Sequence, residues 1–275
     1  MRPAQPAVQA AATALVAVSV AGCALFDPHQ RGQSALERGD YETARRAYSQ
    51  AIEAGRDLAV AYANRCYAEI ALAHNDQALA DCTKSLELAP EDIDPAVYRR
   101  WEVLNNRGVA NLQHRNYEEA IADFTAALEL SPDYVDAIAN RGRAYAESED
   151  YDAALEDLTR AIELNPELAE AFGNRGMAYE SLGDVASAVA DYTRAIELSA
   201  DPQAYFNRAM LNYSEGHFDD AYEDFRATVA RIDDPNSYLR FMAEQQADFL
   251  ENRPKGFDPD ATLTPAADME ATPTP

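Results

Sequence analysis

The sequence is poor in the residues from which most catalytic and metal sites are built. It contains 3 cysteines, 4 histidines and 11 glycines among 275 residues. Three cysteines are too few for a fold held together by a disulfide framework. No phosphate-binding glycine loop, no serine in a nucleophile elbow and no histidine with a ligand at metal-binding spacing is found in the sequence. We therefore expect no enzyme activity, no cofactor and no metal site.

Positive charge is also scarce. The chain has 23 Lys and Arg against 48 Asp and Glu, a net charge of −25. An acidic surface repels a phosphate backbone, so we expect no binding to nucleic acid. The hydrophobic content of 47% is sufficient for a packed core and excludes a chain that is disordered throughout.

The amino-terminal residues have the pattern of an export signal. Arg2 precedes an apolar run over residues 7–20, AVQAAATALVAVSV. This run is shorter than the roughly 20 apolar residues that a transmembrane helix needs, but it has the length of a signal-peptide core. The sequence therefore predicts export from the cytoplasm.

The residues that follow the apolar run are Val20-Ala21-Gly22-Cys23. They resemble the lipobox of bacterial lipoproteins, an aliphatic residue and two small ones before the cysteine that receives the lipid. This resemblance implies a signal peptide over residues 1–22, lipidation of Cys23 and a short tether over residues 23–27. Ala24, rather than Asp, implies transfer to the outer membrane on the side that faces the periplasm. The alternative is an ordinary secretory signal with an incidental cysteine.

The body of the chain is an internal repeat. Asn-Arg followed by a small residue recurs five times, at spacings of 42, 34, 34 and 33 residues. A weaker copy, Gln30-Arg31-Gly32, lies 34 residues before the first of them. An alanine stands fourteen residues after the start of each copy, and an apolar side chain four residues further on. These alanines are Ala44, Ala78, Ala120, Ala154, Ala188 and Ala221. Within each copy the apolar residues have helical spacing, as in the segment 151–164.

A period of 34 residues with these small, apolar and closing proline positions resembles the tetratricopeptide repeat. The resemblance implies an all-α solenoid of about six helix-turn-helix repeats over residues 28–232. A further helix over residues 233–253 is expected to cap the array, and to present a polar outer face to solvent. The tail over residues 254–275 is rich in Pro, Asp and Thr, and we expect it to be disordered.

Two local features accompany the repeat. Eight extra residues precede the third repeat, whose copy is Asn106-Arg107, and Asp94-Pro95 predicts the start of a lengthened helix that includes Trp101. Cys66 and Cys82 occupy positions that face one another in an antiparallel helix pair. They form either a disulfide or two buried free thiols, and the sequence leaves both open.

An arginine and an aspartate recur together, sixteen residues apart, in five repeats. This fixed spacing predicts an ion pair between two helices, within a repeat or between neighbours. The pairs are Arg65 with Asp81, Arg107 with Asp123, Arg141 with Asp157, Arg175 with Asp191 and Arg208 with Asp224.

The resemblance also implies a partner-binding groove lined by the first helix of each repeat. An amide that recurs in every repeat can hold the main chain of an extended peptide. The implied residues are Asn64, Asn106, Asn140, Asn174 and Asn207, with the apolar contacts Tyr67, Val109, Met177, Phe206, Met210 and Tyr213. The alternative is that these asparagines satisfy local backbone groups.

Tetratricopeptide domains that clamp acidic chain ends carry a Lys or Arg four residues before this Asn position. Here those positions hold Val60, Glu102, Asp136, Glu170 and Gln203. We therefore expect a neutral or basic protein partner with apolar anchors. The layout is similar to NlpI-type and pilotin-type lipoproteins of the bacterial cell envelope. It implies a membrane-anchored scaffold that recruits cell-wall enzymes or a protease, or alternatively an assembly factor for a secretion or pilus complex.

Overall fold

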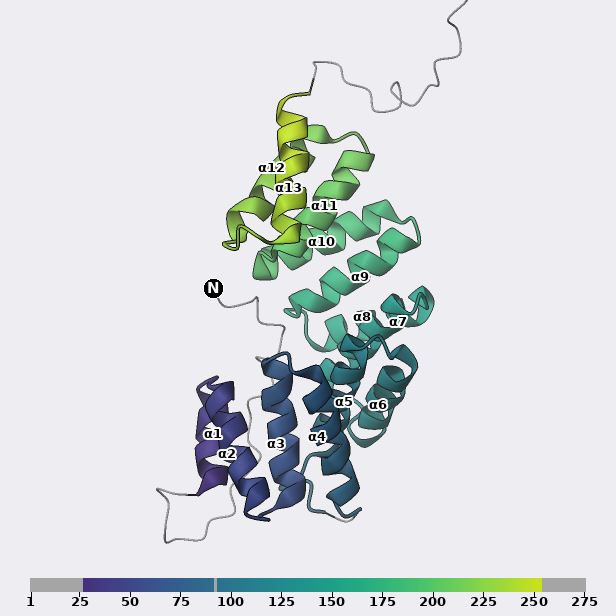
Figure 1. The fold of residues 1–275 in the computed structure, drawn as a ribbon. Coiled ribbons are helices and arrows are strands. Elements are labelled where there is room, and N and C mark those ends of the chain that lie inside the picture. The colour runs from purple at the N-terminus through teal and green to yellow at the C-terminus, as the bar shows by residue number, and fades with distance from the viewer. Residues whose placement is uncertain (1–26, 92, 254–275) are drawn as a thin grey trace, which may run out of the picture. The chain divides into compact units, whose positions relative to one another are not determined.

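The computed structural model describes residues 27–91 and 93–253, and in these ranges the chain forms thirteen α-helices and no strand (Figure 1). Short turns join the helices. The helices are α1 (Pro28–Glu37), α2 (Tyr41–Glu53), α3 (Leu58–Ala71), α4 (Asn75–Leu88), α5 (Arg100–Gln113), α6 (Tyr117–Leu130), α7 (Val135–Glu147), α8 (Tyr151–Leu164), α9 (Ala169–Ser181), α10 (Val185–Ser199), α11 (Pro202–Ser214), α12 (Phe218–Arg231) and α13 (Tyr238–Glu251).

The helices form six consecutive pairs, α1/α2 to α11/α12, followed by the single helix α13. The predicted all-α array of six helix pairs with a terminal helix is thereby confirmed. The chain divides into two compact units between Leu198 and Ser199, close to the end of α10. The first unit contains the first five pairs and the second contains α11, α12 and α13, and each is described by itself.

Within the first unit, the second helix of each pair packs on the first helix of the next pair. Alanines at the recurring positions are fully buried and allow this close approach. One large side chain fills the remaining space in every repeat of this unit except the second, where Cys82 stands at that position. In the third repeat that side chain is Phe124, whose ring crosses Gly108. A Cβ atom at Gly108 would lie 2.6 Å from the ring, so only glycine fits there.

The lengthened helix predicted from Asp94-Pro95 is wrong. The helix α5 begins only at Arg100, and the extra residues form a turn. The Asp94 carboxylate accepts a hydrogen bond from the backbone N–H of Ala96 at 2.8 Å, and the Asp94 carbonyl accepts from Val97 and Tyr98. The turn closes on itself and does not continue as a helix. Tyr98 is carried into the core instead, with 1% of its surface exposed.

In the second unit, α13 packs on α12 through Ala243, Ala247 and Leu250. The opposite face of α13 is not polar, contrary to the expectation for a capping helix. Tyr238 is 76% exposed and Phe241 is 53% exposed. The helix carries more apolar side chains than one face can bury.

Three of the predicted segments lie outside the described residues. They are the signal peptide over residues 1–22, most of the tether with the lipidation site Cys23, and the tail over residues 254–275. Among the described residues, no helix combines the length and the apolar character required to cross a membrane.

Candidate functional site

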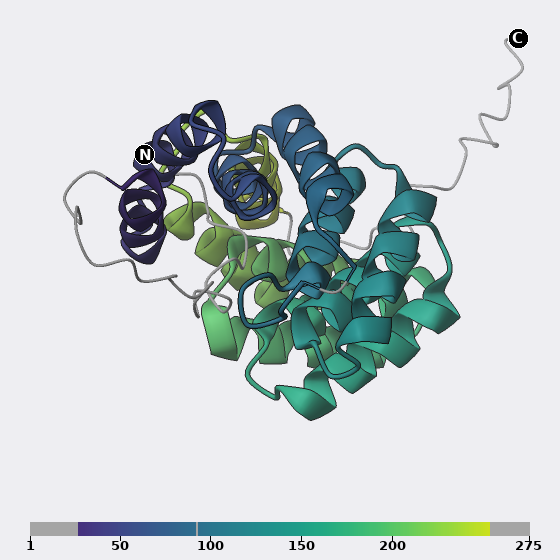
Figure 2. The same ribbon diagram turned by 90° about the horizontal axis from the view of Figure 1, so that it is seen from below.

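The first helices of successive repeats contact one another along the first unit, from α1 through α3, α5 and α7 to α9. Figure 2 shows the helix pairs following one another in chain order through this unit. We use the name first-helix surface for the predicted groove positions on these five helices and the side chains beside them. It carries Asn64, Asn106, Asn140 and Asn174, whereas Asn207 lies on α11 in the second unit.

The asparagines of the first-helix surface are not equivalent. Asn64 is 5% exposed, and among the described residues its amide has no hydrogen-bond partner. Asn140 donates from Nδ2 to Oδ1 of Asn105, 3.0 Å away on the preceding first helix. In the second unit, the Asn207 Oδ1 atom accepts from Gln203 at 2.7 Å. Some of the predicted amides are therefore occupied within the chain.

The predicted apolar contacts also divide into two groups. Tyr67 lies edge-on to Tyr41, with 6.2 Å between ring centroids, and Val109 is half-buried against the core. Met177 is 42% exposed and is available to a partner. In the second unit, Phe206 packs edge-on against Phe225 and Tyr213 packs edge-on against Phe218. Met210 is 39% exposed.

Two carboxylates occupy the middle of the first-helix surface. Burial raises the pKa of Glu102 on α5, although its hydrogen bond with Arg99 opposes the shift. Burial also raises the pKa of Asp136 on α7, and Asp136 adds to the shift at Glu102. The two groups lie close enough to interact, and burial disfavours their charged forms. A cation placed beside them would stabilise both charges.

Each recurring arginine binds its aspartate through at least two hydrogen bonds within one repeat, which confirms the predicted ion pairs. In the fourth repeat, Arg141 donates from Nε and Nη2 to Asp157 at 2.7 and 2.9 Å. The Asp157 side chain is 7% exposed and that of Arg141 is 19% exposed. This geometry serves packing between helices, and it leaves these guanidinium groups little surface for a ligand.

A third contact of the same arginines was not predicted. Arg141 donates from Nη1 to the hydroxyl of Thr125, on the second helix of the preceding repeat, at 3.1 Å. Arg65 and Arg175 make the matching bonds to Ser49 and Thr159. A hydroxyl residue sixteen positions before each of these arginines was the available sequence signal. The arginines thus connect neighbouring repeats as well as the helices of one repeat.

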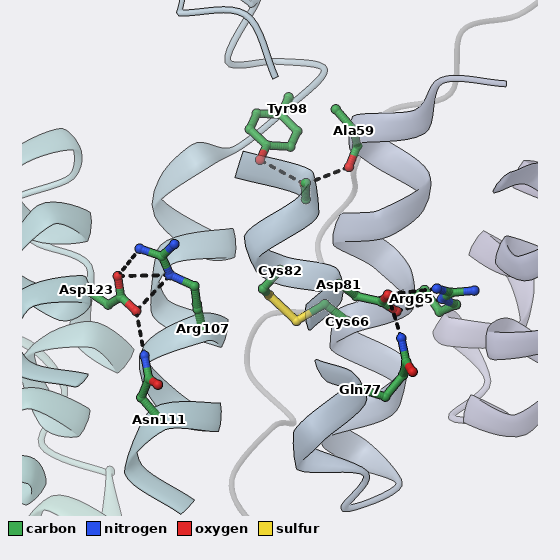
Figure 3. The surroundings of a disulfide bond; sticks show 11 residues. Ala59, Arg65, Cys66, Gln77, Asp81, Cys82, Tyr98, Arg107, Asn111 and Asp123 are labelled. Carbon is green, nitrogen blue, oxygen red and sulfur yellow. Dashed lines mark hydrogen bonds and ion pairs between the residues drawn. A yellow bond between two sulfur atoms is a disulfide. The ribbon is translucent and has the colours of Figure 1, made fainter. Parts of the chain in front are cut away.

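Cys66 and Cys82 form a disulfide in the structure, with 5.4 Å between their Cα atoms (Figure 3). Both residues are fully buried between α3 and α4. Near the end of α4, the Ser85 hydroxyl lies 2.9 Å from the Tyr98 hydroxyl and donates to the Ala59 carbonyl at 2.7 Å (Figure 3). The second repeat is therefore closed by a covalent bond and by a side chain from the inserted turn.

No group of three or more His, Cys, Asp or Glu side chains is arranged to hold a metal ion in residues 27–91 and 93–253. The histidines at the turns serve local contacts. His74 lies 2.7 Å from the Glu69 carboxylate, and His114 lies 3.3 Å from that of Asp76.

Models of the tetratricopeptide repeat match residues 29–93, 101–134, 141–204 and 181–237. Together these ranges cover well over half of the 275 residues. The chain belongs to the tetratricopeptide-repeat proteins. Tetratricopeptide repeats form surfaces that bind other proteins.

Individual tetratricopeptide proteins are similar to parts of the chain. Sperm-associated antigen 1 of Mus musculus is 43% identical over 70 residues, which are 26% of this chain and 8% of that protein. The matching segments span between 8% and 19% of the lengths of the curated relatives.

Two solved structures share the fold at low sequence identity. The pilus biogenesis factor PilW has a TM-score of 0.65 and 19% identity, over 79% of this chain and 96% of its own. The complex of Cut9 with Hcn1 has a TM-score of 0.69 and 17% identity, over 81% of this chain and 42% of that one. Both likenesses concern the solenoid alone.

Proposed function

We propose that this tetratricopeptide-repeat protein is a non-enzymatic scaffold, anchored by lipid in the bacterial cell envelope, that binds another envelope protein on its first-helix surface. The observation that carries the proposal is the pair of desolvated carboxylates, Glu102 and Asp136, in the middle of that surface. In tetratricopeptide domains that clamp acidic chain ends, the same positions hold basic residues.

The charge of the surface selects the partner. A positively charged side chain between Glu102 and Asp136 would relieve the cost of holding two half-buried negative charges close together. Exposed Met177 offers an apolar contact on the same array. The partner is therefore a protein segment that is neutral or basic and carries apolar anchors.

The location in the envelope rests on the amino-terminal sequence. Cys23 follows an apolar run of signal-peptide length in a lipobox-like setting. A lipidated cysteine with several acyl chains would hold the array at a membrane, since each buried methylene contributes about 0.8 kcal/mol. In this arrangement the scaffold recruits cell-wall enzymes or a protease to the outer membrane, on the side that faces the periplasm.

Affinity capture from native membranes tests the proposal. The tagged full-length protein is compared with a variant that carries Glu102→Gln and Asp136→Asn. The matched control carries Glu118→Gln and Glu119→Gln on the exposed start of α6. We expect a defined set of envelope proteins to be lost in the first variant and kept in the control. The same set captured by all three proteins would show that the first-helix surface is not the binding site.

A second candidate is an assembly factor for a pilus or secretion complex of the outer membrane. The similarity to PilW over almost the whole of that protein favours it as an architecture. The nature of the captured partner separates the two candidates. A scaffold for envelope enzymes releases soluble proteins after detergent extraction, whereas an assembly factor releases a membrane-embedded oligomer.

A further inference from the structure

A pocket of about 640 Å³ lies at the amino-terminal end of the array. Its walls come from α1, from Tyr48 on α2, from the turn before α3 and the start of that helix, from Leu88 at the end of α4, and from the inserted turn before α5. The apolar wall includes Val60, Ile93 and Val97, and the polar wall includes Gln33 and Asn64. Its volume is within the range of small-ligand sites and exceeds that of a single side chain.

Tyr48, one of the residues that line this pocket, has a buried hydroxyl without a partner. Tyr48 is 1% exposed, and its Oη atom is the buried side-chain polar atom that finds no hydrogen bond among the described residues. The ring reaches this place by lying across Gly32, where a Cβ atom would be 2.6 Å away. A buried hydroxyl without a hydrogen bond lowers the stability of the folded state, and a ligand that bonded it would remove this cost.

The comparable hydroxyl of the fifth repeat is satisfied. Tyr192 stands at the position of Tyr48, and its hydroxyl donates to Glu180 at 2.7 Å. The position that corresponds to Glu180 in the first repeat holds Leu36, which has no acceptor. The missing partner of Tyr48 is therefore a specific difference in sequence, at the repeat that forms the pocket.

The charge of the lining defines the ligand. Asp27, Glu37 and Asp57 contribute three carboxylates, and the lining that the structure describes contains no lysine or arginine. Arg56, outside the lining, lies 4.0 Å from Asp27. His29, within the lining, lies 4.0 Å from Asp57. The Tyr48 hydroxyl and these carboxylates can accept hydrogen bonds from an ammonium or guanidinium group. The apolar wall can contact an aliphatic side chain.

We propose that this pocket binds a short peptide segment of a partner in which a basic side chain stands beside an apolar one, and that the Tyr48 hydroxyl hydrogen-bonds the segment. The inference rests on the proposed function in that the ligand is part of a protein partner. The pocket lies at the amino-terminal end of the first-helix surface, with which it shares Asn64, and it does not include Glu102 or Asp136.

The test is an NMR titration of the full-length protein with a capped pentapeptide that has one lysine between two leucines. We expect the side-chain amide signals of Asn64 and Gln33 to shift, and a peptide with glutamate in place of lysine to leave them unchanged. Tyr48→Phe is expected to weaken binding about five- to tenfold, the effect of one hydrogen bond. Glu37→Gln is expected to weaken it as well, whereas Glu118→Gln on α6 is the control that does not.

A second measurement separates binding from folding. Because Tyr48→Phe removes an unpaired hydroxyl, we expect its melting temperature to equal that of the wild type or to exceed it by about 2 °C. No peptide binding, or equal binding by the wild type and Tyr48→Phe, would overturn the proposal. Neither result would contradict the proposed function, which the capture experiment with the Glu102 and Asp136 variant tests separately. Conversely, peptide binding that depends on Tyr48 would support the pocket even if that capture identified no partner.

Discussion

The Tyr192 hydroxyl donates to the Glu180 carboxylate at 2.7 Å, and this bond joins the two helices of the fifth repeat. Tyr48 has the same place in the first repeat but faces no such acceptor. The same side chain therefore contributes to stability in one repeat and reduces it in the other.

Removal of the two hydroxyls should have opposite effects. Tyr192→Phe is expected to lower the free energy of unfolding by about 1 kcal/mol, because a hydrogen bond is lost. Tyr48→Phe is expected to leave it unchanged or to raise it by about 1 kcal/mol, because no bond is lost. Urea unfolding followed by circular dichroism measures both. A loss of stability in Tyr48→Phe similar to that in Tyr192→Phe would show that the Tyr48 hydroxyl is bonded in the folded protein.

Loss of one recurring arginine should be costly. Arg141→Ala leaves the Asp157 carboxylate buried without its partner and also breaks the bond to Thr125. We expect a loss of about 3 kcal/mol or more, as for other broken buried pairs. Arg143→Ala is the control on the same helix, since the more exposed pair of Arg143 with Glu147 contributes only about 0.5 kcal/mol. Equal effects of the two variants on the urea midpoint would contradict this account.

The carboxylates of the first-helix surface should make stability fall as pH rises. The ordinary pKa values are 4.5 for Glu102 and 3.8 for Asp136, and burial raises both in the folded protein. Above the ordinary value the unfolded chain releases its proton first, so the folded state loses stability until the raised pKa is passed. The double variant Glu102→Gln, Asp136→Asn removes this loss. We expect its melting temperature relative to the wild type to increase between pH 4 and pH 7; a constant difference would show that neither group is desolvated.

Reduction of the Cys66–Cys82 disulfide should destabilise the second repeat. The bond closes a loop with a sequence separation of 16 residues, for which the loss of chain entropy corresponds to about 3 kcal/mol. We expect a reductant to lower the urea midpoint of the wild type and not that of a Cys66→Ala, Cys82→Ala variant. Alkylation in urea without reductant, read by mass spectrometry, should leave both cysteines unmodified. Two alkylated cysteines would show that the purified protein carries free thiols.

The repeat and its ion pairs were predictable because they depend on spacing alone. The sixteen residues between Arg175 and Asp191 place the two side chains on facing helices in the same way in every repeat. A contact of this kind depends on local helix geometry and on a short turn. Both can be predicted from the sequence pattern of one repeat.

The inserted turn, the outer face of α13 and the pocket depend on contacts that the repeat pattern does not contain. Asp94-Pro95 has the composition of a helix start, but burial of Tyr98 against Ser85 requires the chain to turn there. The pocket needs Tyr48, Asn64 and Val97 from three separate segments to meet. No local signal in the sequence indicates that they do.

The insertion also changes how the repeats are connected. Thr83 occupies the position that corresponds to Thr125, yet among the described residues the hydrogen bonds of Arg107 go to Asp123 alone. Tyr98 and a bond from Arg100 to the Ala89 carbonyl at 2.9 Å connect the second and third repeats instead. In terms of modular construction, three of the four junctions between the repeats of this unit share the arginine–hydroxyl bond, whereas the junction between the second and third repeats has contacts of its own. An engineered array that restored the regular period there would lose the Tyr98 hydrogen bond that now helps to join the second repeat to the third.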